Sequence, residues 1–245
     1  STTVSSIFGQ SVTLLIDGSG TDDLTVSNAL LTGDRLLWGT IESIYVSDVD
    51  FTQQALDRTA IDIRCTIDCI FDDITLSQTE IGLDIDGPGV TEIKNSNIES
   101  TNIALRGSGD GLLILEESNF ISQGKAMTFS GLDTEITDSK AELTQGDGPA
   151  VNVLEGQHEW NAFNVEKTYS SFDTTSQGID AWYTSIQSTE LTTSGYSTGA
   201  VFEDSTLAVG TAAFINGKTT GIHGIQSTFT FEDLTTSAQE YGVRL

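Results

Sequence analysis

The chain has 245 residues, of which 37% are hydrophobic, and it carries 36 acidic against 10 basic side chains, for a net charge of −26. The apolar fraction is too high for a disordered chain. The charge excludes a nucleic-acid-binding protein, because contact with phosphates needs a basic surface, and it disfavours anionic membrane surfaces. No apolar run approaches the roughly 20 residues that cross a bilayer, so we expect no membrane insertion.

The charge also bears on location. An acidic surface suits a cation-rich medium such as a cell exterior, where salt screens self-repulsion. The same acidity would equally serve only to keep a β-rich protein soluble. The N-terminal residues Ser1–Val4 lack the basic flank and apolar stretch of an uncleaved signal peptide and are consistent with a mature end left by cleavage. We expect an extracellular or cell-surface protein.

A short phrase recurs along the chain: a small or polar residue, an apolar residue, any residue, then another apolar or small one. Its copies begin at residues 60, 82, 102, 126, 150, 178, 199, 221 and 242, for example Ala60–Ile63 and Gly82–Ile85. The mean step is about 23 residues. The widened step between 150 and 178 predicts a loop insertion at 154–177.

A second phrase runs out of phase with the first: an apolar residue, two residues, Ser or Thr, one residue, then an apolar residue or Ala. Its copies are Leu24–Ala29, Ile44–Val49, Ile93–Ile98, Leu115–Phe120, Ile136–Ala141 and Ile186–Leu191. Two short strands per repeat with alternating inward positions are what one coil of a β-solenoid requires. Asp-Gly pairs such as Asp86-Gly87 supply turns between them.

These patterns predict an all-β chain in which residues 1–245 form a single β-solenoid domain of about ten coils of about 23 residues. A β-sandwich is the competing fold, since short strands at regular spacing also describe one. A sandwich would not repeat the same phrase in order along the whole chain.

Two neighbouring segments make the pattern specific. Glu92–Ile98 and Ile103–Gly109 resemble the parallel β-helix repeat that pectate lyases, periplasmic copper-site maturation proteins and many surface proteins share. The resemblance covers about residues 10–245 and implies a right-handed parallel β-helix of the non-catalytic surface-protein type. It indicates an architecture and not an activity, because enzymes and non-enzymes both use this repeat.

The chain contains only part of the catalytic motifs found in enzymes that share this repeat. Polygalacturonase-like members carry Asn-Thr-Asp, Asp-Asp, Gly-His-Gly and Arg-Ile-Lys. This chain has Asp-Asp at 22–23 and 72–73, but it lacks Asn-Thr-Asp and Arg-Ile-Lys, and Gly221–Gly224 only approximates the histidine motif. Hydrolysis of a neutral glycan by two carboxylates stays open as an alternative. We expect a protein that is not an enzyme and has no cofactor, with the exception of calcium.

Calcium is the one metal that the acidic turns suggest. Asp84 and Asp86 offer hard oxygen ligands, and Asp110 lies in Gly107–Leu112, which resembles one copy of a Gly/Asp-rich calcium turn. The motif does not recur at the nine-residue period that stacked calcium turns need. The simpler interpretation is that Asp-Gly only makes a turn.

Cys65 and Cys69 are the only cysteines. In one extended strand they would lie about 13 Å apart, beyond the ~7 Å limit between the Cα atoms of a disulfide. An intrachain bridge would therefore need a tight bend at Thr66–Asp68. Otherwise the two residues are buried thiols, or they cross-link subunits.

Aromatic residues gather in and after the widened coil. Trp160, Trp182 and Tyr183 are candidates to stack on sugar rings, although strand alternation would equally bury Trp160 in the core. These residues predict a glycan site.

The two ends of the predicted solenoid look uncapped. Val12, Leu14 and Ile16 already alternate like strand residues, and the repeat phrase reaches Val243 and Leu245. Open rims favour head-to-tail pairing between copies of the chain. We therefore expect a self-assembling, extracellular structural subunit of a filament, sheath or surface layer. The alternative is a carbohydrate-binding or carbohydrate-active β-helix, such as an adhesin or a polysaccharide depolymerase.

Overall fold

The computed structural model describes residues 2–5, 8–10, 24–54, 58–146, 148–168, 175–217 and 219–245. Every regular element in these residues is a β-strand. The N-terminal part contains β1 (Thr2–Ser5), β2 (Phe8–Gln10), β3 (Leu24–Gly33), β4 (Leu37–Gln53), β5 (Thr59–Asp86), β6 (Val90–Lys94) and β7 (Asn97–Ser108). The middle contains β8 (Leu112–Glu116), β9 (Asn119–Ser122), β10 (Lys125–Ser130), β11 (Asp133–Thr137), β12 (Lys140–Leu143), β13 (Pro149–Leu154), β14 (Gln157–Asn161) and β15 (Phe163–Lys167). The C-terminal part contains β16 (Gln177–Trp182), β17 (Ser185–Ser194), β18 (Thr198–Glu203), β19 (Thr206–Gly217), β20 (Thr220–Ile225), β21 (Thr228–Ala238) and β22 (Tyr241–Arg244).

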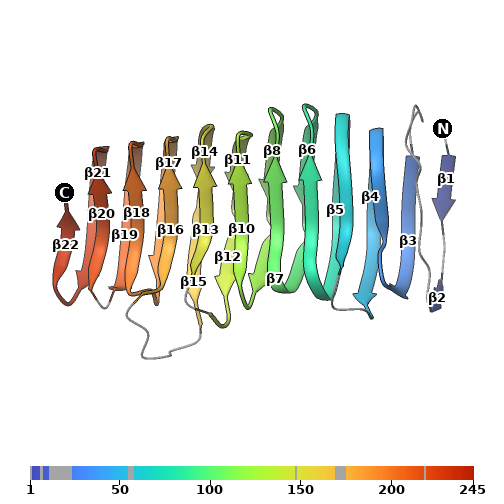
Figure 1. Cartoon of the computed structure of the whole chain (residues 1–245), viewed down its shortest axis with the longest axis horizontal. Helices are drawn as coiled ribbons and strands as arrows, with labels where there is room; N and C mark the ends of the chain where they lie inside the picture. Colours follow the sequence, from blue (N-terminus) through green and yellow to red (C-terminus); the bar gives the residue numbers. More distant parts are fainter. Residues whose placement is uncertain are drawn as a thin grey trace.

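The strands stack in parallel coils along one axis, from β1 at the N-terminal end to β22 at the C-terminal end (Figure 1). Parallel pairing between successive coils rules out the competing β-sandwich, whose sheets are antiparallel. The solenoid has about nine turns of about 22 residues, close to the predicted ten turns of about 23. No helix capable of crossing a membrane occurs in the described part of the chain.

Each coil passes through three faces, which we call B, C and A in chain order. Face A consists of β10, β13, β16, β18, β20 and β22, with the end of β7, both ends of β5 and the start of β4. Face B consists of β1, β6, β8, β11 and β14, with the first halves of β3, β17, β19 and β21 and the middle of β4 and β5. Face C consists of β2, β9, β12 and β15, the start of β7, and the remaining parts of β3, β4, β5, β17, β19 and β21.

Inward side chains stack in register into one continuous core. On face A, Leu83 pairs with Leu105, Leu105 with Met127, and Met127 with Val151. All four are completely buried, and burial of one such side chain contributes roughly 1.5–3 kcal/mol. This register corrects one copy of the repeat phrase: Leu105, and not Ile103, lies opposite Leu83, so that copy begins at residue 104 instead of 102.

Buried serines form a ladder at the corner between faces B and C. Ser96, Ser118 and Ser139 lie on successive coils, each after a residue whose φ is 48 to 50°. The Ser118 hydroxyl donates to the Glu116 carbonyl at 2.8 Å and accepts from the Ser96 backbone N–H at 3.1 Å. The Ser118 N–H donates in turn to the Ser139 hydroxyl at 3.2 Å. In the copies of the second sequence phrase that contain Ser96, Ser118 and Ser139, the serine is therefore the residue that satisfies the backbone at this corner.

The inserted segment is shorter in the structure than the predicted range 154–177. Most of that range forms β14 and β15, which are regular rungs of faces B and C. Val151 nevertheless pairs with Ile179, 28 positions later. The extra residues lie between Lys167 and Gln177, and 169–174 fall outside the described residues.

Candidate functional site

Face A collects five of the ten basic side chains of this acidic chain. Arg64, Arg106 and Arg244 project from β5, β7 and β22, and Arg35 and Lys125 lie where the chain enters this face. Exposed aromatic side chains share the face: Trp38, Trp182 and Tyr241. Cations and aromatic rings together provide hydrogen-bond donors and apolar contact area, which makes the outer surface of face A the candidate functional site.

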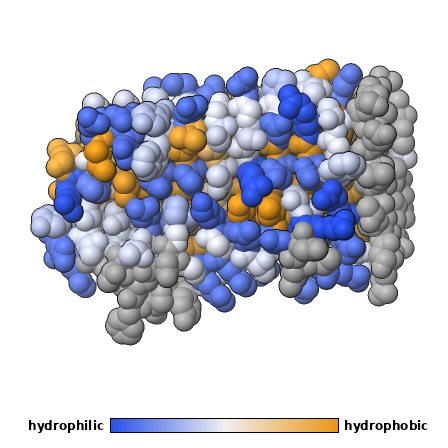
Figure 2. Space-filling view, in the orientation of Figure 1, coloured by the Kyte–Doolittle hydropathy of each residue, from blue (hydrophilic) through white to orange (hydrophobic). Residues whose placement is uncertain are grey.

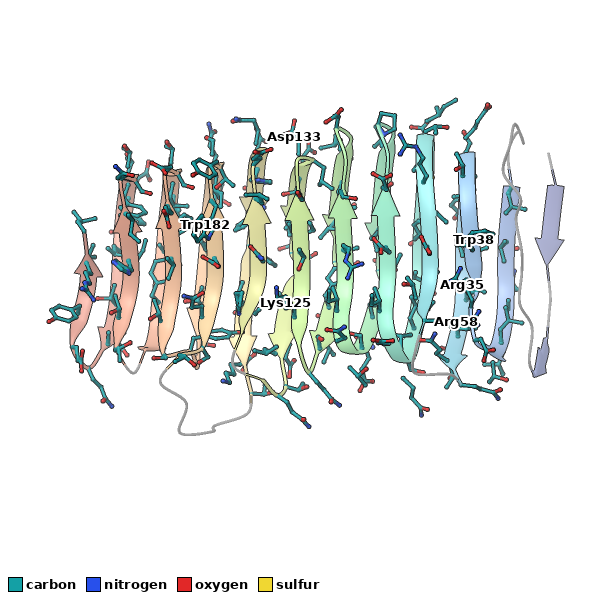
Figure 3. The ribbon with its side chains drawn as sticks, in the orientation of Figure 1. Arg35, Trp38, Arg58, Lys125, Asp133 and Trp182 are labelled. Atoms are coloured by element: carbon teal, nitrogen blue, oxygen red, sulfur yellow. A yellow bond between two sulfur atoms is a disulfide. The ribbon has the colours of Figure 1, made fainter. Side chains whose placement is uncertain are left out.

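Trp182, predicted to contact a glycan, is exposed at the C-terminal half of this face (Figure 3), and Tyr183, predicted with it, is exposed in the bend that follows β16. Trp182 is 37% exposed and Tyr183 57% exposed. The Trp182 indole N–H donates a hydrogen bond to Asp180 Oδ1 at 2.8 Å, which restrains the ring. Burial raises the pKa of the Asp180 carboxyl above its usual value, against the lowering effects of this hydrogen bond and of Lys125. The site therefore combines a held aromatic ring with a carboxylate acceptor.

The structure contradicts the prediction that Trp160 contacts a glycan. Trp160 is completely buried and packs edge-on against Phe163, with ring centroids 5.1 Å apart. Its indole N–H donates to Thr134 Oγ1 at 2.9 Å, and that oxygen lies 2.9 Å from Nδ1 of the buried His158. Alternation along β14 points His158 and Trp160 inward and Glu159 outward.

Two of the three aspartates predicted to bind calcium form ion pairs with arginines. Asp84 Oδ2 lies 2.9 Å from Arg106 Nη1, and Asp86 Oδ2 lies 2.7 Å from Arg64 Nη1. Burial raises the pKa of Asp84, although Arg106 acts to lower it. Asp110 is exposed in the turn before β8, and no group of three or more His, Cys, Asp or Glu side chains among the described residues is arranged to hold a metal. The structure does not bring the three aspartates into one cluster, and calcium binding by them stays a prediction.

Cys65 and Cys69 form an intrachain disulfide, with their Cα atoms 6.1 Å apart. The bend that such a bridge needs is a bulge in β5: Ile41 pairs with Cys65, but Ser43 pairs with Asp68, so β5 has one extra residue between these pairs. Both cysteines are buried, and neither is free. The open alternatives of buried thiols and a cross-link between subunits are thereby settled in favour of the intrachain bridge.

Only one of the two predicted assembly edges, the C-terminal one, lies within the described residues. Val12, Leu14 and Ile16 lie outside the described residues. At the other end, Val243 is 42% exposed and Leu245 is 86% exposed. Among the described strands, β22 pairs with β20 alone and β21 pairs with β19 alone. Within the described residues, no strand pairs with the other long side of β21 or of β22.

The core is incompletely covered at this edge. Phe229, Phe231 and Leu234 of β21 pack against the core and are only partly buried. Phe229 and Phe231 stack on each other, with centroids 6.1 Å apart. Figure 2 shows apolar surface, in orange, at the C-terminal end of the molecule. This edge exposes both apolar side chains and backbone hydrogen-bonding groups.

Shallow depressions mark the outer surface, and one of about 370 Å³ lies at the corner of faces B and C beside Asn28, Asp48 and Asp73. Two others lie on the faces themselves. One on face B, of about 390 Å³, is lined by polar side chains that include Glu159, Asn161, Gln187, Thr189 and Glu232. The other, of about 220 Å³, lies on face A and is lined by Trp38, Thr40, Asp62, Arg64 and Asp86. Sequence reasoning did not single out Trp38 or Arg64. The available signal was the outward position of Trp38 between the inward residues of its strand.

Comparison with known proteins finds no matching family model, no matching curated protein and no matching solved structure.

Proposed function

We propose that the protein is an extracellular structural subunit that assembles head to tail through the ends of its solenoid. The observation that carries the proposal is the open edge of β21 and β22, where partly exposed core side chains accompany unpaired strand sides. Exposed strand edges of this kind are templates for pairing with another chain. Each solenoid coil buries its apolar edge only against its neighbours, so a further coil would complete this one.

The occupant that we propose is a second copy of the chain. β1 and β2 lie on faces B and C and pair along one side with β3. The open side of β21 also presents faces B and C. Stacking β1 and β2 of one copy on β21 of another would continue the parallel order of the faces. Such contact between two different surfaces generates filaments unless it closes into a ring.

Two features support a location outside the cell. The Cys65–Cys69 disulfide is of a kind that persists in oxidising compartments and is rare in the cytosol. The net charge of −26 suits a salt-rich medium, in which self-repulsion between copies is screened. Assembly should therefore strengthen as salt rises.

The test is sedimentation velocity over a range of protein and salt concentrations, with and without calcium, on the parent chain and on Val243→Lys. Val243 is partly exposed on β22, which lies beside β21 at the same end of the solenoid, so a lysine there is tolerated in one subunit but would lie at the contact when a second copy stacks on this end. We expect at least a ~100-fold weaker association, because an unpaired buried charge costs several kcal/mol. Leu154→Lys is the matched control, since Leu154 is similarly exposed (40%) on the outer side of face A.

A parent chain that stays monomeric at high concentration and in high salt would refute the assembly proposal. Equal weakening by Val243→Lys and Leu154→Lys would do the same, because it would assign the effect to charge and not to the edge. Negative-stain microscopy of the same samples reports whether the assemblies are linear.

The second candidate function is binding of a glycan, and it is favoured by two exposed neighbours, Trp182 on face A and Tyr183 in the bend that follows it. Exposed aromatic rings beside polar side chains suit the C–H faces and hydroxyl groups of sugars. Trp182→Ala should remove binding on a glycan array and leave the fold intact. A parent chain that binds nothing on the array removes this candidate. Both candidates are non-catalytic.

A further inference from the structure

We infer that the depression beside Trp38 on face A is a binding site for a neutral sugar ring. The inference deepens the glycan-binding candidate and is independent of assembly. It names a different position from Trp182: the two rings lie toward opposite ends of the same face (Figure 3).

Strand register builds the depression. Trp38 and Thr40 point outward from β4, and they pair with Asp62 and Arg64 of β5. Asp86, one coil further on, completes the wall. The volume of about 220 Å³ is below the ~300–1,000 Å³ of pockets that enclose a drug-sized molecule. It therefore suits a single ring, with the rest of a longer ligand outside.

The Trp38 side chain contributes little to the packing of the core. It is 45% exposed, whereas the core contact at this point of β4 is made by the completely buried Leu37. The corresponding outward positions on the following coils carry polar side chains, among them Asp84, Arg106 and Thr128. A large apolar ring exposed among polar residues is more informative about binding than about stability.

The ring is also held in place. The Arg35 guanidinium lies over the Trp38 ring at 5.7 Å from its centroid, which is a cation–π arrangement. Arg35 also lies 3.9 Å from Asp62. A ring that is restrained before binding loses less conformational entropy when a ligand stacks on it.

The charges around Trp38 balance, unlike those of the chain as a whole. Arg35 faces Asp62, and Arg64 Nη1 lies 2.7 Å from Asp86 Oδ2. These two pairs place carboxylate acceptors and guanidinium donors around one aromatic ring, with the Thr40 hydroxyl able to do both. An anionic sugar would be repelled by the overall charge of −26. A neutral ring with hydroxyl groups at its edge and C–H groups on its faces matches all three kinds of contact.

The experiment is titration of the full chain with neutral gluco-, manno- and galacto-oligosaccharides, with oligogalacturonate as the anionic comparison, by isothermal calorimetry. The variants are Trp38→Ala, Asp62→Asn and Trp182→Ala, the last reporting on the other exposed tryptophan of face A. Tyr45→Ala is the matched control, because Tyr45 is a similarly exposed aromatic residue (40%) of the same strand β4 but lies on face B. We expect binding of at least one neutral series, a loss of at least ~10-fold in affinity for Trp38→Ala, and a change below ~2-fold for Tyr45→Ala. Circular dichroism and the thermal midpoint of each variant check that the fold is retained.

The inference is overturned if Trp38→Ala binds as well as the parent chain, or if no neutral series binds. Loss of binding in Trp182→Ala alone overturns it as well, while keeping the glycan-binding candidate. Preference for oligogalacturonate over the neutral series also counts against it. Sedimentation of Trp38→Ala reports assembly separately, so failure of the sugar site and failure of the assembly proposal are distinguishable.

Discussion

Acidification should destabilise the coil that contains His158, through a hydrogen-bond chain that requires the neutral imidazole. The Trp160 indole N–H donates to Thr134 Oγ1. The Thr134 hydroxyl can then donate to His158 Nδ1, and the His158 Nε2–H to the Glu155 carbonyl at 3.1 Å. A proton on Nδ1 would turn this nitrogen into a donor, so the Thr134 hydroxyl would lose the acceptor of its own hydrogen.

Burial lowers the pKa of His158 from 6.5 to about 4, although the Glu155 carbonyl and Asp133 act to raise it. Between those values the unfolded chain binds a proton that the folded chain does not, so the free energy of unfolding falls as the pH falls. The stabilisation is complete above pH 6.5 and is lost by about pH 4. At 1.36 kcal/mol per pH unit the loss amounts to about 3 kcal/mol.

The assay is urea denaturation followed by circular dichroism at pH 7, 5.5 and 4, for the parent chain and for His158→Gln. Carboxylates titrate over the same range in both proteins, so the difference between the two curves isolates His158. We expect His158→Gln to be less stable at pH 7 and to approach the parent at pH 4, with the gap shrinking by about 3 kcal/mol. His223→Gln, on the outward side of β20, is the matched control for the replacement of a histidine by glutamine. Parallel curves for the parent and His158→Gln would refute the reasoning.

Three further substitutions test the packing of the coils. Ser118→Ala should lower the free energy of unfolding by about 1–3 kcal/mol, because it leaves a buried backbone N–H of the previous coil without its acceptor; exposed Ser130→Ala is the control in the same urea assay. Gly111→Ala should shift the thermal midpoint down, since its new Cβ would overlap the Gly89 carbonyl oxygen, whereas Gly148→Ala, with no atom within 4 Å of the new Cβ, should leave it nearly unchanged. Replacing both cysteines of the Cys65–Cys69 bridge by alanine should cost about 2 kcal/mol, because the closed loop is short; a change as large as that of a core deletion would contradict this estimate.

Much of the candidate site could not be predicted from the sequence. Trp182 and Tyr183 are exposed as predicted, but Trp160 occupies the core, and Trp38 was not anticipated. The reason is that a local pattern gives the direction of a side chain along its own strand, but not its neighbours on adjacent coils. The partners of Trp38 come from β5, at positions that depend on how many residues each corner uses.

The sequence by itself determined the architecture: a period near 22 residues with two out-of-phase apolar phrases is compatible with stacked parallel coils and with little else, because inward positions must recur once per turn to bury a continuous core. It also located the serines of the second phrase, but the structure showed that their hydroxyls satisfy backbone groups at the corner between faces B and C. Only the tertiary structure decided the register of the coil at Leu105, the bulge that brings Cys65 to Cys69, and the gathering of arginines on face A. Each of these depends on the register between adjacent coils. Because the coils differ in length, this register is set by the backbone pairing between turns and not by the spacing along the sequence.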